Sequence, residues 1–209
     1  MEISFFCIAS GSSGNCFYLS VDDTAILIDA GLSQRAVKKA LKEKNLSLSK
    51  VKGIFVTHDH ADHIKGVSTL SNENMIPVYA TSEVHKGMKK SYCMTRDIDT
   101  ALVRKLEKGE ELSLGAITIH SFEVPHDGTD NVGYHISMGD INLCIIFTRH
   151  CICCKETPEF WDSMAESYAK KAHSKRERQD SEDFLNRFVW EKGETVLDVA
   201  CGPGNFAIP

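Results

Sequence analysis

A strand-like run that ends in a dense cluster of possible metal ligands limits most strongly what this chain can fold into. Residues 51–57 read as a strand, and the next six residues are His58-Asp59-His60-Ala61-Asp62-His63. Imidazole nitrogens and carboxylates suit zinc and neighbouring divalent metals, and a catalytic site commonly uses about three protein ligands plus water. A loop at a strand end can point several side chains into one cleft while the sheet keeps them rigid. The sequence therefore predicts a metal centre here.

Short strands and amphipathic helices alternate around this motif. The periodicity predicts strands at 2–8, 16–21, 24–29, 51–57, 77–80, 117–124, 133–138 and 141–147, and helices at 34–44, at 62–70 and from about 82. Beyond residue 149 the pattern changes to amphipathic helices at 158–172 and 181–190, followed by an apolar strand at 195–199. This order indicates an α/β fold with mixed sheets.

Composition narrows the class of protein. Hydrophobic residues make up 42% of the 209-residue chain and charged residues 25%, which is typical of a folded protein. The net charge of −5 argues against a large nucleic-acid-binding face, although nucleic acid held locally as a substrate is compatible with it. No apolar run approaches the roughly 18 residues of a membrane helix, and no export signal precedes the first strand. We expect a cytoplasmic protein without membrane contact, whose eight cysteines are reduced.

Three short pieces together carry a resemblance to a known family. They are Ser-Gly-Ser-Ser-Gly-Asn-Cys at 10–16, Ile-Leu-Ile-Asp-Ala-Gly at 26–31 and the run from His58 to His63. Over residues 1–146 the chain resembles the metallo-β-lactamase superfamily, and more narrowly a bacterial branch of metal-dependent phosphodiesterases or exonucleases. The resemblance implies a four-layer αββα sandwich, with the metals in a cleft along the edge where the two sheets meet.

The resemblance also implies a ligand set for one or two ions, zinc or manganese. His58 and His60 are expected to bind one metal, and Asp62 and His63 the second. In this family a third histidine for the first metal comes from a later loop.

That third histidine has three candidates. His126 is preferred because Pro125 ends a strand and frees the next side chain to turn into the cleft. His120 and His135 are the alternatives, and both lie within strand-like runs.

Hydrolysis is the reaction that such metals support, because a divalent ion lowers the pKa of bound water from about 15.7 to about 7. Asp59 and Asp62 are the predicted catalytic residues. Asp59 either holds a proton as an acid or base or shapes the loop. Asp29, at the end of its strand, is either an acceptor that orients a ligand histidine or an ordinary turn residue. The expected substrate is a phosphoester or a nucleic acid, and the oligomeric state is left open.

The chain departs from the family after residue 146. Thr148 or Arg149 stands where the family has an aspartate that bridges the two metals, and the further histidine that the family supplies from a downstream segment is not visible, so the second metal site is expected to be impaired. His150, Cys151, Cys153 and Cys154 are spaced too closely for a structural zinc site.

The C-terminal part resembles another family. Residues 155–209, with Thr-Val-Leu-Asp-Val at 195–199 and Gly-Pro-Gly at 202–204, resemble the start of an S-adenosylmethionine-dependent methyltransferase. Only five residues follow Gly204, whereas a nucleotide-binding βαβ unit needs about 30. We therefore expect an incomplete metallo-β-lactamase-like domain at 1–148, a junction at 149–157 and a truncated, Rossmann-like methyltransferase fragment at 158–209. The predicted function is a metal-dependent phosphodiesterase or nuclease, and the alternative is a non-catalytic hybrid or truncated product.

Overall fold

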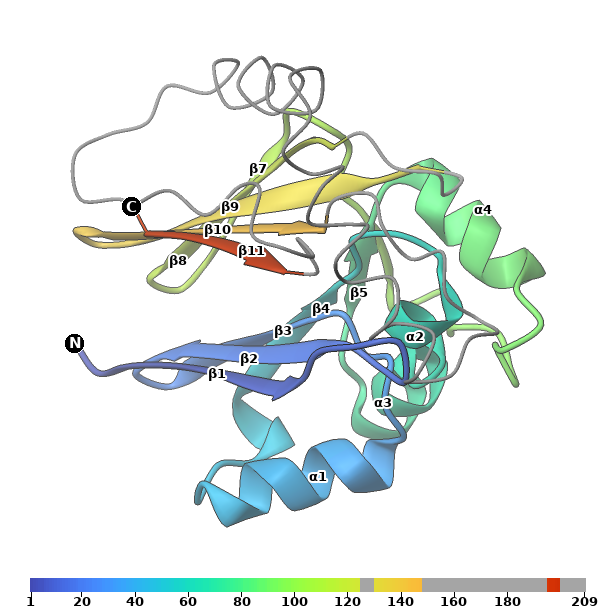
Figure 1. Ribbon diagram of the computed structural model, residues 1–209, viewed down its shortest axis with the longest axis horizontal. Coiled ribbons are helices and arrows are strands. Elements are labelled where there is room, and N and C mark those ends of the chain that lie inside the picture. Colours follow the sequence, from blue (N-terminus) through green and yellow to red (C-terminus); the bar gives the residue numbers. More distant parts are fainter. Residues whose placement is uncertain (125–129, 148–194, 200–209) are drawn as a thin grey trace, which may run out of the picture.

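Two β-sheets that face each other form the centre of the molecule (Figure 1). The computed structural model describes residues 1–124, 130–147 and 195–199. The first sheet has the order β1 (Ile3–Ala9), β2 (Cys16–Val21), β3 (Thr24–Ile28), β4 (Val51–Phe55), β5 (Val78–Ala80) and β6 (Val103–Lys105). The second has the order β11 (Thr195–Val199), β10 (Ile141–Phe147), β9 (Val132–Met138), β8 (Ile117–Glu123) and β7 (Glu111–Leu114).

The strand directions differ between the two halves of the first sheet. Strands β1 to β3 pair antiparallel, whereas β3 to β6 pair parallel. In the second sheet β7 to β10 form an antiparallel meander, and β11 pairs parallel with β10. Parallel neighbours need crossover connections, so most of the described helices follow strands of the first sheet.

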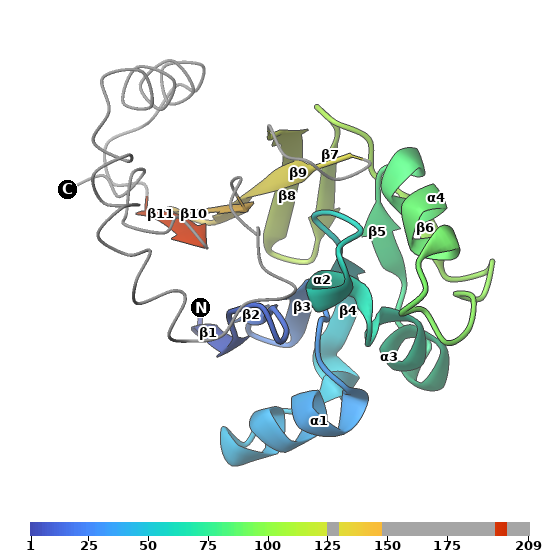
Figure 2. The same cartoon turned by 45° about the vertical axis from the view of Figure 1, so that its right-hand side comes forward.

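The helices are α1 (Gln34–Glu43), the 3₁₀ turn η1 (Leu48–Lys50), α2 (Ala61–Ile64), α3 (Val67–Asn74) and α4 (Ser82–Lys90). Helices α1 and α3 lie on the face of the first sheet that points away from the second (Figures 1 and 2). The α1 helix begins where predicted, since the Ser33 hydroxyl accepts a hydrogen bond from the Ala36 amide at 3.3 Å. None of the helices in the described ranges is long and apolar enough to cross a membrane.

Two hydrophobic cores lie on opposite faces of the first sheet. Alternate residues of β2 serve different cores: Tyr18 packs with the helices, and Phe17 and Leu19 pack between the sheets. In β3, Leu27 faces the helices and Ile28 faces the second sheet. Fully burying one such side chain stabilises the fold by about 1.5–3 kcal/mol. Burial on both faces fixes the position of the loops that follow these strands.

Most predicted elements of residues 1–147 are confirmed, with three differences. Strands β6 and β7 were not predicted, because both are short and carry exposed charged residues. The helix predicted at 62–70 is wrong in its continuity, since the chain breaks at Gly66 into α2 and α3. A Cβ at Gly66 would lie 1.9 Å from the carbonyl oxygen of Leu32, so this close approach excludes any larger side chain.

The predicted α/β sandwich is confirmed in its two sheets and in the helices on the first sheet. The strand predicted at 195–199 is also present, as β11. The helices predicted at 158–172 and 181–190 lie outside the described residues. The predicted junction at 149–157 also lies outside them. The division into domains therefore stays a prediction.

Candidate metal centre

The histidine-rich loop lies where the two sheets meet. It follows β4 and ends in α2, which Figure 2 shows beside the β3 and β4 strands. The Thr57 carbonyl accepts a hydrogen bond from the Val132 amide at 3.0 Å, and the Val56 carbonyl accepts one from the Tyr134 hydroxyl at 2.7 Å. Phe147, the last residue of β10, packs its ring edge-on at 4.6 Å from the ring of His63. Both sheets therefore hold this loop.

Three predicted histidine ligands gather in it. The ring centroid of His58 lies 4.6 Å from that of His60 and 4.0 Å from that of His63. His58 and His63 are buried, whereas His60 is half-buried at the start of α2. The short loop thus brings three imidazoles into one cluster, as the sequence predicts.

Asp29 anchors this cluster from the end of β3. Its Oδ1 accepts a hydrogen bond from the Thr57 amide at 2.8 Å. Its Oδ2 accepts one from the Thr57 hydroxyl at 2.8 Å and lies 2.7 Å from Nδ1 of His63. Asp29 is fully buried and has a φ of 56°, a left-handed conformation that few residues other than glycine adopt. Its place beside His63 is that of an acceptor which orients a histidine, and not that of an ordinary turn residue.

These contacts assign the proton positions on two of the rings. The Thr57 hydroxyl donates its only proton to Asp29, so at 2.9 Å from Nδ1 of His58 it can only accept. In His63, Nδ1 faces the Asp29 carboxylate and therefore also carries the proton. A neutral imidazole holds one ring proton, so Nε2 of both His58 and His63 keeps its lone pair. That is the tautomer in which Nε2 can bind a metal.

Asp62 lies in the first turn of α2, next to His63. Its Oδ2 is 3.5 Å from Nε2 of His63 and 2.9 Å from the side-chain nitrogen of Asn15. The carboxylate is largely buried and faces the same side as the histidine nitrogen. The structure therefore places Asp62 with the three histidines.

Asp59 lies against α4. A Cβ built on Gly87 of that helix would lie 1.9 Å from Oδ2 of Asp59. Gly87 is buried in the middle of α4, so the glycine gives the carboxylate room beside the helix backbone. Asp59 is thus placed where the metal loop meets α4.

His126, the preferred later histidine, lies outside the described residues, as do Thr148, Arg149 and His150. The alternatives His120 and His135 face each other across β8 and β9. Their sequence neighbours Ile119 and Ile136 point into the core between the sheets, so both histidines project from the opposite, outer face. Neither can join His58 and His60.

The described donors fit a divalent cation in type and protonation. Three imidazoles and a carboxylate are the ligands that zinc and manganese accept, and the hydrogen bonds place the ring proton of His58 and His63 on Nδ1. Within residues 1–124, 130–147 and 195–199, no group of three or more His, Cys, Asp or Glu side chains is arranged so that it could hold a metal ion.

Sequence reasoning missed two residues of this cluster. Thr57 appeared only as the end of a strand, and Asn15 only as part of a glycine-rich turn. The side-chain nitrogen of Asn15 lies 3.0 Å from Nε2 of His63, although 48 positions separate the two residues. The one available signal was a polar residue beside an apolar strand in each case.

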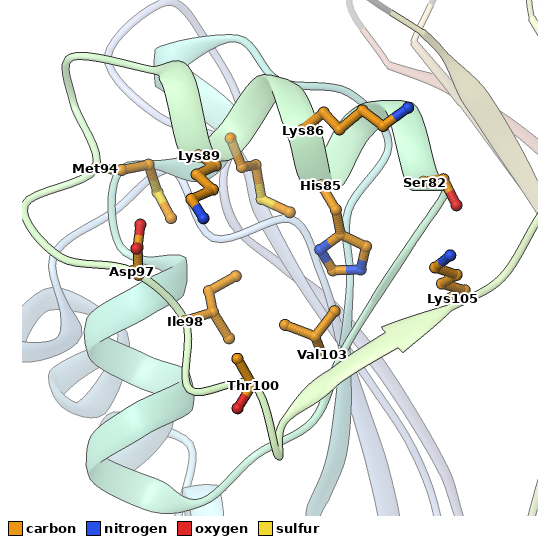
Figure 3. A pocket seen from close by; sticks show the side chains of 11 residues that line it. Ser82, His85, Lys86, Lys89, Met94, Asp97, Ile98, Thr100, Val103 and Lys105 are labelled. Carbon is orange, nitrogen blue, oxygen red and sulfur yellow. The ribbon is translucent and has the colours of Figure 1, made fainter.

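A separate cavity of about 350 Å³ lies on another side of α4 (Figure 3). His85, Lys89 and Lys105 point toward it, and Ile98 and Val103 line its floor. It contains none of the residues of the histidine loop. The imidazole of His85 lies 2.9 Å from the Arg104 carbonyl, and burial lowers the His85 pKa.

Comparison with known proteins agrees with this architecture. Residues 24–144 match the family described as Beta-lactamase superfamily domain, and the chain belongs to this family. It is 34% identical over 146 residues to exodeoxyribonuclease YycJ of Bacillus anthracis, covering 70% of this chain and 54% of that protein. It is 33% identical over 139 residues to exodeoxyribonuclease WalJ of Streptococcus pneumoniae, covering 66% of this chain and 51% of that protein. The chain thus spans about half the length of these curated relatives.

Solved structures show the same fold. The class B3 di-zinc metallo-beta-lactamase LRA-12 from an Alaskan soil metagenome superposes with a TM-score of 0.63 at 14% identity. The superposition covers 93% of this chain and 77% of that one. The resemblance of residues 155–209 to a methyltransferase falls outside the described residues, apart from β11, and gains no support from these comparisons.

Proposed function

We propose that this chain is a metal-dependent hydrolase of phosphodiester bonds in nucleic acid. The proposed metal ligands are His58, His60, Asp62, His63 and His126, with one or two zinc or manganese ions. The two exodeoxyribonuclease names among its relatives favour a nucleic-acid substrate over a β-lactam.

The hydrogen-bond chain through Asp29 is the observation that carries this proposal. One buried carboxylate sets the tautomers of His58 and His63 together, at 2.8 Å through Thr57 and at 2.7 Å directly. A merely polar loop has no need to hold two buried imidazoles in one cluster with Nδ1 of each ring hydrogen-bonded. Such partners raise the basicity of ligand histidines and fix the direction of their rings.

A divalent ion, when bound, acts as a Lewis acid toward a phosphoryl oxygen and makes bound water more acidic. The chain's own residues have distinct roles around it. Asp29 and Thr57 hold the rings of His58 and His63 in one orientation through hydrogen bonds to their Nδ1 atoms. Phe147 packs against the His63 ring and keeps solvent from that side.

Asp59 and Asp62 are the proposed catalytic carboxylates. Asp62 has one oxygen, Oδ2, bound by Asn15, and Oδ1 has no partner among the described residues. Asp59 is proposed to hold or deliver a proton from its place beside α4. We also propose that the ion at Asp62 and His63 binds more weakly than the ion at His58 and His60, because Thr148 or Arg149 replaces the carboxylate expected between them.

The test is nuclease activity of the full chain with added zinc or manganese. Fluorescent single-stranded and double-stranded DNA and a chromogenic phosphodiester serve as substrates. We expect cleavage that disappears in His58→Ala and with a chelator, and that returns to the wild-type protein when metal is restored. His120→Ala is the matched control, since it removes an imidazole from the outer face of β8.

Two results would overturn the proposal. Equal activity in His58→Ala and His120→Ala would show that the cleavage does not come from this centre. The complete absence of cleavage by metal-loaded protein would favour the alternative, a non-catalytic hybrid or truncated product.

A further inference from the structure

The Asn15 side chain connects the N-terminal loop to two proposed metal ligands. Asn15 lies just before β2 and is only 3% exposed. Its side-chain nitrogen, Nδ2, is 2.9 Å from Oδ2 of Asp62 and 3.0 Å from Nε2 of His63. A third acceptor, the Gly11 carbonyl oxygen, lies 3.1 Å from the same nitrogen.

The rest of Asn15 is held just as firmly. Its Oδ1 accepts a hydrogen bond from the Gly11 amide at 2.9 Å, which fixes which end of the side-chain amide points toward the ligands. Its backbone amide donates to the Asp62 carbonyl at 2.7 Å, and its carbonyl accepts from the Gly31 amide at 2.8 Å. The Asn15 backbone can approach this closely because Gly31 has no side chain: a Cβ there would lie 1.5 Å from the Asp62 carbonyl oxygen.

The side-chain nitrogen of Asn15 has more hydrogen-bond acceptors around it than it has N–H donors. A side-chain amide has two N–H donors, and three acceptors surround it here. Nε2 of His63 is one of them, because Nδ1 of that ring carries the proton toward Asp29. If the Nε2 lone pair is given to a cation, two acceptors remain for two donors. The site is thus built so that metal binding by His63 leaves every Asn15 donor with one partner.

We infer that Asn15 is a positioning residue that holds Asp62 and His63 in place for the metal. Its hydrogen bond to Nε2 of His63 breaks when that nitrogen binds the metal. The inference rests on the proposed function, in which Asp62 and His63 are ligands. An asparagine suits the role because its side-chain oxygen accepts from the Gly11 amide while its side-chain nitrogen donates to Asp62 and His63. Alanine offers neither group, and leucine offers only the volume.

The test measures metal affinity of the full-length chain by competition with a chromogenic chelator, together with the visible absorption spectrum of bound cobalt. Loss of an outer hydrogen-bond partner typically weakens metal binding about 10–100-fold. We expect a loss of this size in Asn15→Ala and Asn15→Leu, with a changed cobalt spectrum. Asn74→Ala is the matched control, because Asn74 also donates to two acceptors, Oε1 of Gln34 and the Leu70 carbonyl, and neither acceptor belongs to the metal loop.

Unchanged affinity and spectrum in both Asn15 variants would overturn the inference while leaving the proposed function standing. Failure of wild-type protein to bind any ion would instead overturn the proposed function.

A second measurement does not depend on how well the variants fold. In ¹⁵N-labelled wild-type protein, the side-chain amide signals of Asn15 should shift when zinc is added, whereas those of Asn74 should stay. Asn15 signals that do not move at zinc saturation would contradict the inference.

Discussion

Asp29 Oδ2 lies 2.7 Å from Nδ1 of His63, although 34 positions separate the two residues. The contact joins the end of β3 to α2 and lies at the base of the histidine cluster. Because Asp29 also accepts two hydrogen bonds from Thr57, its carboxylate has three donors. This buried carboxylate therefore holds Thr57 and the ring of His63 in a fixed orientation.

Replacing Asp29 with asparagine should weaken metal binding by about 10–100-fold. The new NH₂ group must face at least one of the three donors, so one buried donor loses its partner at a cost of about 1–3 kcal/mol. Chelator competition measures the affinity, and urea unfolding measures the free energy. Asp23→Asn is the control, because Asp23 is exposed and pairs with Lys50 at the surface. Equal affinities in the two variants would mean that Asp29 does not orient a ligand.

The Thr57 hydroxyl is predicted to contribute more to stability and to metal binding than the Thr57 methyl group does. Thr57→Val keeps the shape but leaves Nδ1–H of His58 without its acceptor, which should cost about 1–3 kcal/mol in the metal-free protein. Thr57→Ser keeps the hydroxyl and should bind metal nearly as the wild type does. Unfolding and metal titrations of the two variants provide the comparison. The opposite order, with serine worse than valine, would contradict the proton assignment of His58.

Gly87 and Asp59 are predicted to be coupled. Alanine in a helix is normally about 1 kcal/mol better than glycine, but here a Cβ would clash with Oδ2 of Asp59 at 1.9 Å. Gly87→Ala should therefore destabilise the wild-type protein, and it should destabilise the Asp59→Ala protein less, because only the Cβ of residue 59, at 2.9 Å, remains close to the added methyl group. A double-mutant cycle of unfolding free energies measures this difference, with an expected coupling of about 1–3 kcal/mol. Additive effects would mean that Asp59 does not pack on α4.

The lowered pKa of His85 predicts a pH dependence of stability. Burial is the main cause of the shift, and it acts against the hydrogen bond to the Arg104 carbonyl. Because the folded pKa lies below the ordinary value of 6.5, the unfolded chain binds a proton first as the pH falls. The stabilising contribution is thus present above about pH 6.5 and is lost as the pH falls toward the folded pKa.

Unfolding of His85→Gln and wild-type protein, compared between pH 7.5 and pH 5, isolates this effect. The wild type should lose more stability than the variant over that interval. Parallel curves would exclude the burial of His85 as a source of pH dependence.

The sequence predicted the parts of the centre that depend on local pattern. The ligand run from His58 to His63 and the strand before it are contiguous, so periodicity and residue type sufficed. The break at Gly66 was not predictable, since it depends on contact with Leu32 from another loop. The role of Asn15 was hidden for the same reason: its partners lie 47 and 48 positions away.

The choice among the later histidines shows a similar limit. His120 and His135 were alternatives to His126 in the sequence, because alternation gives the two faces of a strand but not which face meets the metal loop. The sheet register settles that point against both of them. His126 stays a prediction, and it depends on the family resemblance and on Pro125 before it.

The most direct test of the whole account is the metal content of the purified full-length chain. The protein is loaded with zinc, freed of excess ion by dialysis and measured by elemental analysis, beside His58→Ala and His120→Ala. The account predicts a stoichiometric amount of zinc in the wild type and in His120→Ala, and a clear loss in His58→Ala. Wild-type protein that retains no stoichiometric zinc or manganese, or a His58→Ala variant that retains as much as the wild type, would contradict it.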